Sequence, residues 1–392
     1  MSSEPPTPPR EPQRAMQSTS EVRAMAELPA RAAIGLAGGF LPPLVALAIA
    51  AVVGDLLILS FGEAPGTVFR LLIEGTWGNA YGIGQVLYKT TTLVCTGLAF
   101  ALAGRAGLFN VGAEGQLAAG GFGAAVLGLL LPAGTPALLA VPLCLVAAML
   151  AGAAVGAVPG VLRARFGASE VIVTIMLNFI VLACLNWVVS SKLHVPETLH
   201  TPPIVAGMVP RFADGMAAFR GSAANATIVF AVLAAVVSWW YLFRTRSGYA
   251  VRAVGLQPDA AEYGGVRVPR VLLVTMCLSG ALAGLGGMNF VLGYKGYYEE
   301  GFAGGAGFLG IAVALVGRNH PFGILGAALL FATLSQGGLA VNAVVPKQLT
   351  DILTAVVILA VATAVPEVQT QLRAAAANVT AAFYRDARKG VS

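Results

Sequence analysis

The chain has 392 residues, of which 57% are apolar and only 11% are charged. A soluble domain carries about a quarter charged residues, so 42 charged side chains are too few for a soluble protein of this length. Because one transmembrane helix needs about 20 apolar residues, the composition predicts a polytopic membrane protein. It excludes a secreted disulfide scaffold, a disordered protein and an ordinary cytosolic enzyme.

The apolar runs divide the chain into three parts. Residues 1–33 hold five prolines among the first twelve positions and are expected to form a disordered cytoplasmic segment. A transmembrane domain is expected over 34–366, followed by a cytoplasmic tail over 367–392. The runs within the domain are 34–61, 85–104, 108–131, 136–162, 171–190, 225–243, 271–292, 308–317, 322–342 and 349–366. They predict an all-α polytopic membrane protein with about ten transmembrane segments, although 308–317 is too short to span alone.

The distribution of Lys and Arg predicts the orientation of the chain. If the N terminus is cytoplasmic, the cytoplasmic segments hold 17 basic residues and the opposite side holds six. This asymmetry favours cytoplasmic N and C termini. The net charge of +6 falls in short loops and forms no continuous basic face. We therefore expect membrane lipid, and no nucleic acid, as a partner.

Several chemical signatures are absent or weak. Cys95, Cys144, Cys184 and Cys277 lie in apolar runs without CxxC spacing, so neither a disulfide nor a metal site is expected. The sequence has no GxxxxGK[ST] or HExxH motif, and Gly305–Gly310 match GxGxxG without the acidic residue that a dinucleotide site needs. No catalytic residue is predicted, and the chain is not expected to be an enzyme.

Two glycine-rich apolar segments lie at corresponding positions in the two halves of the chain. They are Gly104–Gly123 and Gly305–Gly323, and their first residues are 201 positions apart. Non-helical backbone at membrane depth must line a cavity or the protein interior. The segments therefore predict two pseudo-repeated halves with glycine-broken helices beside a transport pathway.

Five polar residues are candidates for that pathway: Asn110, Glu114, Gln116, Asn178 and Asn289. A carboxylate at membrane depth is costly, so Glu114 either contacts the substrate or supports a broken helix by accepting backbone hydrogen bonds. Each asparagine could line a wet cavity. A single asparagine in a span more often makes a hydrogen bond between helices.

Five motifs in order carry a resemblance to a known family. They are GLFNVGAEGQ (Gly107–Gln116), FGASEVIVTIMLN (Phe166–Asn178), GYAVRAVGLQPDAAEYGGV (Gly248–Val266), LSGALAGLGG (Leu278–Gly287) and GIAVALVGRNHPFG (Gly310–Gly323). Over roughly 34–366 the chain resembles ABC importer permeases of the branched-chain amino acid/sugar/nucleoside permease superfamily. Among these it is most similar to the general nucleoside permeases. One departure is Leu309, where many nucleoside relatives are expected to carry a polar residue.

The resemblance implies a permease subunit that forms a translocation path for nucleosides with a second permease, identical or paralogous. ATP would be used by a cytosolic ABC ATPase, and an extracytoplasmic substrate-binding protein would deliver the substrate at a bacterial plasma membrane. The inner loop 244–270 resembles the coupling segment that docks on the ATPase. The residues concerned are Gly255, Pro258, Asp259, Ala260, Ala261 and Glu262. Pro258 suits the first position of a short helix, and acidic residues suit its first turn.

Other interpretations remain open. A secondary transporter would work without ATP and would need charges within the membrane, for which Lys89 and Glu114 are the candidates. An ABC permease for sugars or branched-chain amino acids would share the fold. An intramembrane enzyme would need paired acids or a histidine cluster. Loop 244–270 could also be an ordinary loop that satisfies the positive-inside rule.

Overall fold

The computed structural model describes residues 48–342, 344–346, 348 and 351–360. The chain divides into two compact units, Asp55–Thr354 and a smaller unit that consists of Met1–Gly54 with Ala355–Ser392. Residues 48–54 and 355–360 of the smaller unit are described, and both stretches are helical. The described part of the larger unit is also helical, and its extended pairing is limited to two isolated bridges.

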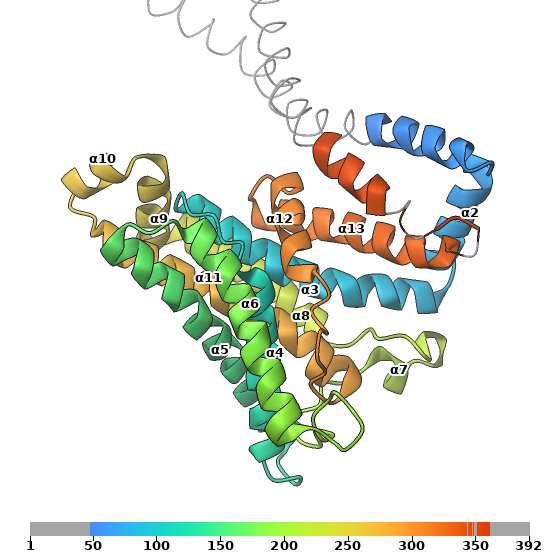
Figure 1. Cartoon of the computed structure of the whole chain (residues 1–392), viewed down its shortest axis with the longest axis horizontal. Helices are drawn as coiled ribbons and strands as arrows, with labels where there is room; N and C mark the ends of the chain where they lie inside the picture. Colours follow the sequence, from blue (N-terminus) through green and yellow to red (C-terminus); the bar gives the residue numbers. More distant parts are fainter. Residues whose placement is uncertain (1–47, 343, 347, 349–350, 361–392) are drawn as a thin grey trace, which may run out of the picture. The chain divides into compact units, whose positions relative to one another are not determined.

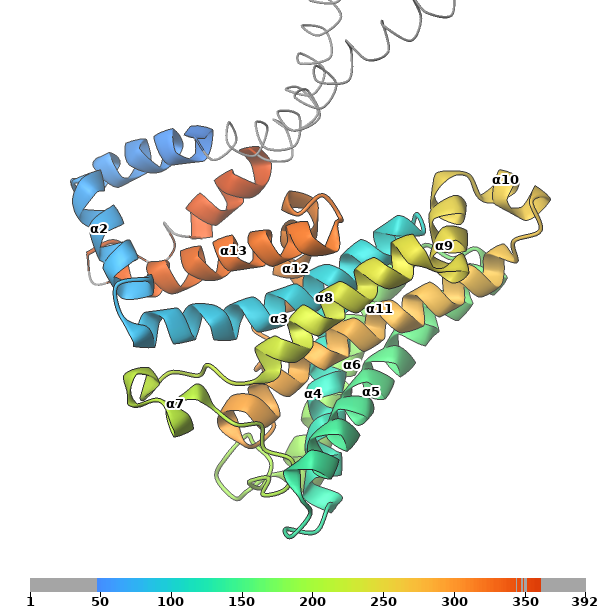
Figure 2. The ribbon, with the colours of Figure 1, turned by 180° about the vertical axis from the view of Figure 1, so that it is seen from behind.

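The helices of the larger unit are coloured in chain order in Figures 1 and 2. They are α2 (Pro65–Thr76), α3 (Ala80–Arg105), α4 (Ala113–Leu130), α5 (Ala137–Phe166), α6 (Glu170–Val188), α7 (Phe212–Gly215), α8 (Thr227–Arg244), α9 (Arg246–Leu256), α10 (Pro258–Tyr263), α11 (Val268–Phe290), α12 (Ala306–Val316) and α13 (Pro321–Val341). Three short turns of π or 3-10 helix are η1 (Val189–Leu193), η2 (Ala217–Phe219) and η3 (Val291–Lys295).

Seven described helices are long and apolar enough to cross a membrane. They are α3, α4, α5, α6 with η1, α8, α11 with η3, and α13. The bent pair Ala48–Ser60 and Pro65–Thr76 brings the number to eight if it is counted as one span. The chain is therefore a multi-pass helical membrane protein.

The predicted apolar runs between residues 85 and 342 each correspond to one helix. The run 308–317 forms α12, which has only 11 residues. Helix α2 was not predicted, since its 12 residues include an arginine and a glutamate. The first and last apolar runs extend beyond the described residues, and segments 1–33 and 367–392 lie outside them entirely. For these reasons the described spans number seven or eight rather than ten, and the duplication of halves stays a prediction.

Glycines allow α5 and α11 to pack with their backbones in contact. A Cβ atom at Gly152 would overlap the carbonyl oxygen of Gly280, and one at Gly284 would overlap that of Ala148. Helix α4 lies beside the same pair in both views (Figures 1 and 2). Small residues four apart allow such a close approach in membrane helices, and α4, α5 and α11 pack as one group.

The two polar excursions of the larger unit lie at opposite ends of it. Helix α7 belongs to the loop between α6 and α8, and α10 to the loop between α8 and α11. Both views place α7 and α10 far apart, with the long helices between them (Figures 1 and 2). Because α8 runs from one excursion to the other, the two loops emerge on opposite sides of the span.

Candidate functional site

A cavity of about 290 Å³ lies beside Lys89, and we call it the Lys89 cavity. Its lining residues come from α3, α4, α11, α12, α13 and the loop before α12. They are Tyr88, Lys89, Thr92, Leu93, Leu117, Phe290, Phe302, Ala303, Gly304, Gly305, Ala306, Leu309 and Ser335. The Nζ atom of Lys89 donates a hydrogen bond of 3.1 Å to Oγ of Ser335 on α13. The cavity thus combines a cation and hydroxyl groups with apolar walls.

A second cavity of about 440 Å³ adjoins the first at Lys89. It is lined by Gly75, Asn79, Tyr81, Gln85, Lys89, Gln336, Leu339 and Ala340. Tyr81, Gln85 and Lys89 are spaced four residues apart on α3, and residues four apart lie on one face of a helix. The two cavities therefore follow one polar face of α3, and Lys89 lies where they meet.

Aromatic side chains form one wall of the Lys89 cavity. The rings of Phe290 and Phe302 stack with centroids 4.7 Å apart, and Tyr298 packs edge-on against Phe302 at 5.3 Å. Tyr88 packs against Tyr294 at 5.4 Å. Apolar and aromatic walls with a few converging polar groups are typical of pockets for small ligands. This arrangement suits a planar, polar molecule.

The carboxylate of Glu114 lies at the beginning of α12. It accepts hydrogen bonds of 2.7 Å from the backbone amides of Gly305 and Gly307, one on each oxygen. A carboxylate is favourable there, because the first amides of a helix have no partner within the helix. Glu114 is buried and does not line the Lys89 cavity. The geometry favours the supporting role over direct contact with substrate.

Asn110 and Gln116 belong to a closed hydrogen-bond network at the start of α4. Asn110 donates to Gln116 at 2.8 Å and to Ser279 on α11 at 2.7 Å, and its own oxygen accepts from the amide of Gly112. Both side chains are fully buried. The network holds the non-helical segment between α3 and α4 against α11.

Asn178 fixes the same segment from the other side. Its amide group on α6 accepts a hydrogen bond of 2.9 Å from the amide of Gly115 and donates one of 2.9 Å to the carbonyl oxygen of Val111. The structure therefore brings Asn110, Gln116 and Asn178 together around one segment, away from the residues that line the Lys89 cavity.

Asn289, like Glu114, contacts a residue that lines the Lys89 cavity. Its amide nitrogen donates to the hydroxyl of Thr92 at 2.9 Å, and Thr92 lines the Lys89 cavity. Its oxygen accepts from Asn225 at 2.9 Å and from Thr227 at 2.7 Å. Asn289 thus connects the wall of the cavity to the start of α8.

The predicted coupling residues lie on two helices. Gly255 belongs to α9, and the other five belong to the short helix α10. Ala260 is exposed, whereas Ala261 is only 7% exposed and packs within the chain. Gly255 on α9 packs against the backbone of Arg105, where a Cβ atom would overlap the carbonyl oxygen. Ala261 and Gly255 therefore shape the segment from within, and Ala260 remains on its surface.

Two groups of residues at these sites were not predicted from the sequence. Leu256, the last residue of α9, and Tyr263, the last residue of α10, are 85% and 96% exposed. Phe302 and Ser335 join Lys89 only in the folded chain, since they lie on separate segments. The one usable signal was the i, i+4 spacing of Tyr81, Gln85 and Lys89 along α3.

The structure defines a multi-pass helical membrane protein with two cavities along one span. Residues 82–362 match the family described as branched-chain amino acid transport system / permease component. The chain belongs to this family. It is 36% identical over 329 residues to the nucleoside ABC transporter permease protein NupB of Lactococcus lactis, covering 82% of this chain and 90% of the relative.

Two further relatives carry similar descriptions. The guanosine ABC transporter permease protein NupP of Bacillus subtilis is 36% identical over 335 residues, which are 82% of this chain and 92% of the relative. The glucose ABC transporter permease protein TsgB13 of Haloferax volcanii is 31% identical over 329 residues, which are 81% and 85% of the two chains. These relatives are components of transport systems by their names.

Proposed function

We propose that this chain is the membrane permease subunit of an ATP-driven ABC importer, and that its substrates are nucleosides. Two relatives at 36% identity, described as nucleoside and guanosine permeases, support this substrate class. The Lys89 cavity is the structural observation that carries the proposal. Its aromatic wall suits stacking of a nucleobase, while Lys89, Thr92 and Ser335 offer hydrogen bonds to ribose hydroxyls or base edges.

The path through the membrane would follow the polar face of α3. A substrate would pass between the two cavities that share Lys89, and a second permease, identical or paralogous, would complete the path. Glu114, Asn110, Gln116 and Asn178 would hold the walls of this path in place rather than contact the substrate. Asn289 would act on the path through the Thr92 hydroxyl.

The α9–α10 segment would transmit movement from a cytosolic ABC ATPase. Gly265, at φ +83°, ends α10: the amide of Val266 donates to the carbonyl of Ala261, and that of Gly265 to the carbonyl of Glu262. This is the Schellman arrangement, which ends a helix sharply. It gives a compact element whose exposed Tyr263, Ala260 and Leu256 would enter the ATPase surface.

The excess of basic residues beside α9 and α10 supports a cytoplasmic location for that end, with both termini on the same side of a bacterial plasma membrane and about ten passes in two repeated halves. An extracytoplasmic binding protein would deliver substrate at the α7 end. ATP would be bound by the ATPase and not by this chain.

A sugar is the second candidate substrate. The 31% identity to a glucose permease supports it. The test is uptake of radiolabelled guanosine, uridine and glucose by cells that express the chain with its ATPase, second permease and binding protein. Nucleoside uptake that glucose does not compete for is expected. Glucose uptake without nucleoside uptake would replace the proposal with the second candidate.

A further inference from the structure

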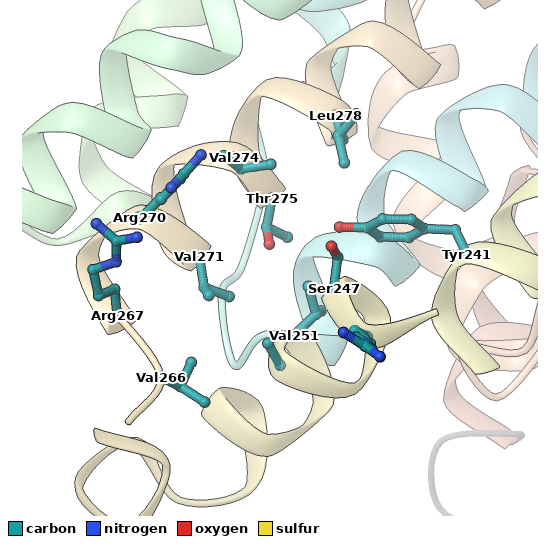
Figure 3. Close-up of a pocket in the computed structure, with 12 residues that line it drawn as sticks. Tyr241, Ser247, Val251, Val266, Arg267, Arg270, Val271, Val274, Thr275 and Leu278 are labelled. Atoms are coloured by element: carbon teal, nitrogen blue, oxygen red, sulfur yellow. The ribbon is translucent and has the colours of Figure 1, made fainter. Parts of the chain in front are cut away.

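A second kind of cavity lies at the α10 end of the larger unit, between α8, α9 and α11. Its volume is about 560 Å³, nearly twice that of the Lys89 cavity. Its lining residues are Tyr241, Arg246, Ser247, Ala250, Val251, Val266, Arg267, Arg270, Val271, Val274, Thr275 and Leu278 (Figure 3). We call it the arginine pocket, and the proposed transport path does not use it.

The mouth of the arginine pocket is strongly cationic. Arg246, Arg267 and Arg270 contribute three exposed guanidinium groups, and no acidic side chain is among the lining residues. Within the described part of the chain, none of the three forms an ion pair. Figure 3 shows Arg267 and Arg270 on one side of the pocket, with Tyr241 and Ser247 across from them. Such a mouth is complementary to a phosphate group.

The pocket becomes apolar with depth along α11. Val271, Val274 and Leu278 line it beyond Arg270. Eight residues separate Arg270 from Leu278, so the lining extends about 12 Å along the helix axis, at 1.5 Å a residue. Because α11 is a candidate span, its arginine end lies at the membrane surface and Leu278 lies toward the hydrocarbon. A soluble anion would leave this apolar part of the pocket empty.

The hydroxyl of Thr275 supplies an independent observation. Thr275 is fully buried in the middle of α11, and its Oγ1 atom has no hydrogen-bond partner in the described structure. In Figure 3 the side chain points into the pocket, between Val271 and Ser247. A buried polar atom without a partner is unfavourable and calls for a ligand that supplies one. The ester carbonyl of a glycerolipid lies below the phosphate and could accept this hydrogen bond.

We propose that the arginine pocket binds an anionic phospholipid. The phosphate lies among Arg246, Arg267 and Arg270, an ester carbonyl accepts a hydrogen bond from Thr275, and an acyl chain covers Val274 and Leu278. Basic pockets between helices at the membrane surface bind anionic head groups on the same physical grounds. The inner-leaflet location rests on the proposed function, which places this end of the protein at the cytoplasm. Because α9 and α11 both line the pocket, the lipid bridges the two helices that flank α10.

The test is binding of phosphatidylglycerol to the full-length protein in detergent, measured by native mass spectrometry and by the midpoint of thermal unfolding. Phosphatidylcholine with the same acyl chains, glycerol phosphate and inorganic phosphate are the comparison ligands. We expect phosphatidylglycerol alone to remain bound and to raise the midpoint. Equal binding of phosphatidylcholine would overturn the charge argument, and equal binding of glycerol phosphate or inorganic phosphate would reduce the pocket to a simple phosphate site.

Variants of single arginines distinguish binding in the arginine pocket from nonspecific attraction between the lipid and a basic protein. Arg267→Gln and Arg270→Gln should each weaken phosphatidylglycerol binding about tenfold, the scale of one charge-assisted hydrogen bond. Arg165→Gln, an exposed arginine in the last turn of α5 outside the pocket, should leave binding unchanged. Thr275→Val should weaken binding and stabilise the lipid-free protein, because it removes the unpartnered hydroxyl.

One further result would overturn the proposal, namely that Arg267→Gln and Arg270→Gln both bind phosphatidylglycerol as well as the wild-type protein. Neither lipid binding nor the unfolding midpoint depends on transport, so a failure of the lipid site and a failure of nucleoside uptake are distinguishable.

Discussion

The carboxylate of Glu114 accepts a hydrogen bond of 2.7 Å from the backbone amide of Gly307, a residue 193 positions later in the chain. Its second oxygen accepts from Gly305. The interaction joins the first glycine-rich segment to the second, at the point where α12 begins. Because Gly305 also lines the Lys89 cavity, Glu114 holds one residue of the cavity wall in place without lining the cavity itself.

Replacement of Glu114 should therefore weaken the fold before it affects substrate binding. We expect Glu114→Ala to lower the free energy of unfolding by about 1–3 kcal/mol, because two buried amides lose their acceptor. The measurement is thermal unfolding in detergent, together with nucleoside uptake at equal protein abundance. Glu74→Gln, at an exposed carboxylate, is the control. A stable Glu114→Ala variant with lost uptake would instead indicate direct contact with substrate.

The packing of α5 against α11 gives a second prediction. Gly284→Ala should destabilise the protein by about 1–3 kcal/mol, the usual cost of overpacking, because the new Cβ meets the carbonyl oxygen of Ala148. Gly326→Ala in α13 is the matched control, since no atom lies within 4 Å of its Cβ position. Thermal unfolding of the two variants measures the difference. Equal midpoints would contradict the close packing of these helices.

Lys89 is the residue on which the proposed path most depends. We expect Lys89→Met to reduce nucleoside uptake at least about tenfold, the effect of losing one charge-assisted hydrogen bond. The protein should still reach the membrane, because methionine fills a similar volume beside Ser335. Lys192→Met, at an exposed lysine in η1, is the control for charge. Wild-type uptake by the Lys89 variant would remove the cavity from the path.

The helical segments and the short helix α10 could be predicted from local signals. Apolar runs of about 20 residues identify spans, and Pro258 with Gly264 and Gly265 predicts where α10 begins and ends. The cavity could not be predicted in this way. Lys89, Phe302 and Ser335 meet only after α3, α12 and α13 pack, and a single sequence records no such contact.

Contacts between distant residues also could not be predicted for the site residues. Asn110 and Gln116 were predicted to belong to the transport pathway, and the structure buries both side chains in a hydrogen-bond network outside the lining of the Lys89 cavity. Asn110 also donates to Ser279 on α11, 169 positions away, and no local signal pairs these two residues. The sequence also could not separate Ala260 from Ala261, because the direction in which α10 rests on α9 decides which alanine is exposed.

Because Ala260 is exposed and Ala261 is buried, substitutions at the two positions should affect the contact with the ATPase differently. Ala260→Arg and Tyr263→Ala should each reduce copurification with the ATPase at least about tenfold, because tyrosines are frequent among the residues that dominate interfaces and an arginine at position 260 would overpack a close contact. Both variants should unfold at the wild-type midpoint. Ala261→Glu should instead lower the midpoint, since it places a charge at a buried position. Met216→Ala, at an exposed residue next to α7, is the control. Unchanged copurification of all the variants would exclude α10 from the contact.

The most direct test of the central claim is uptake by proteoliposomes. The purified chain is reconstituted alone, and also with its second permease, ATPase and binding protein, and entry of radiolabelled guanosine is followed with and without ATP. The account predicts entry only in the complete complex and only with ATP, and none through the chain alone under an ion gradient. Gradient-driven entry through the chain alone would contradict it and would establish a secondary transporter.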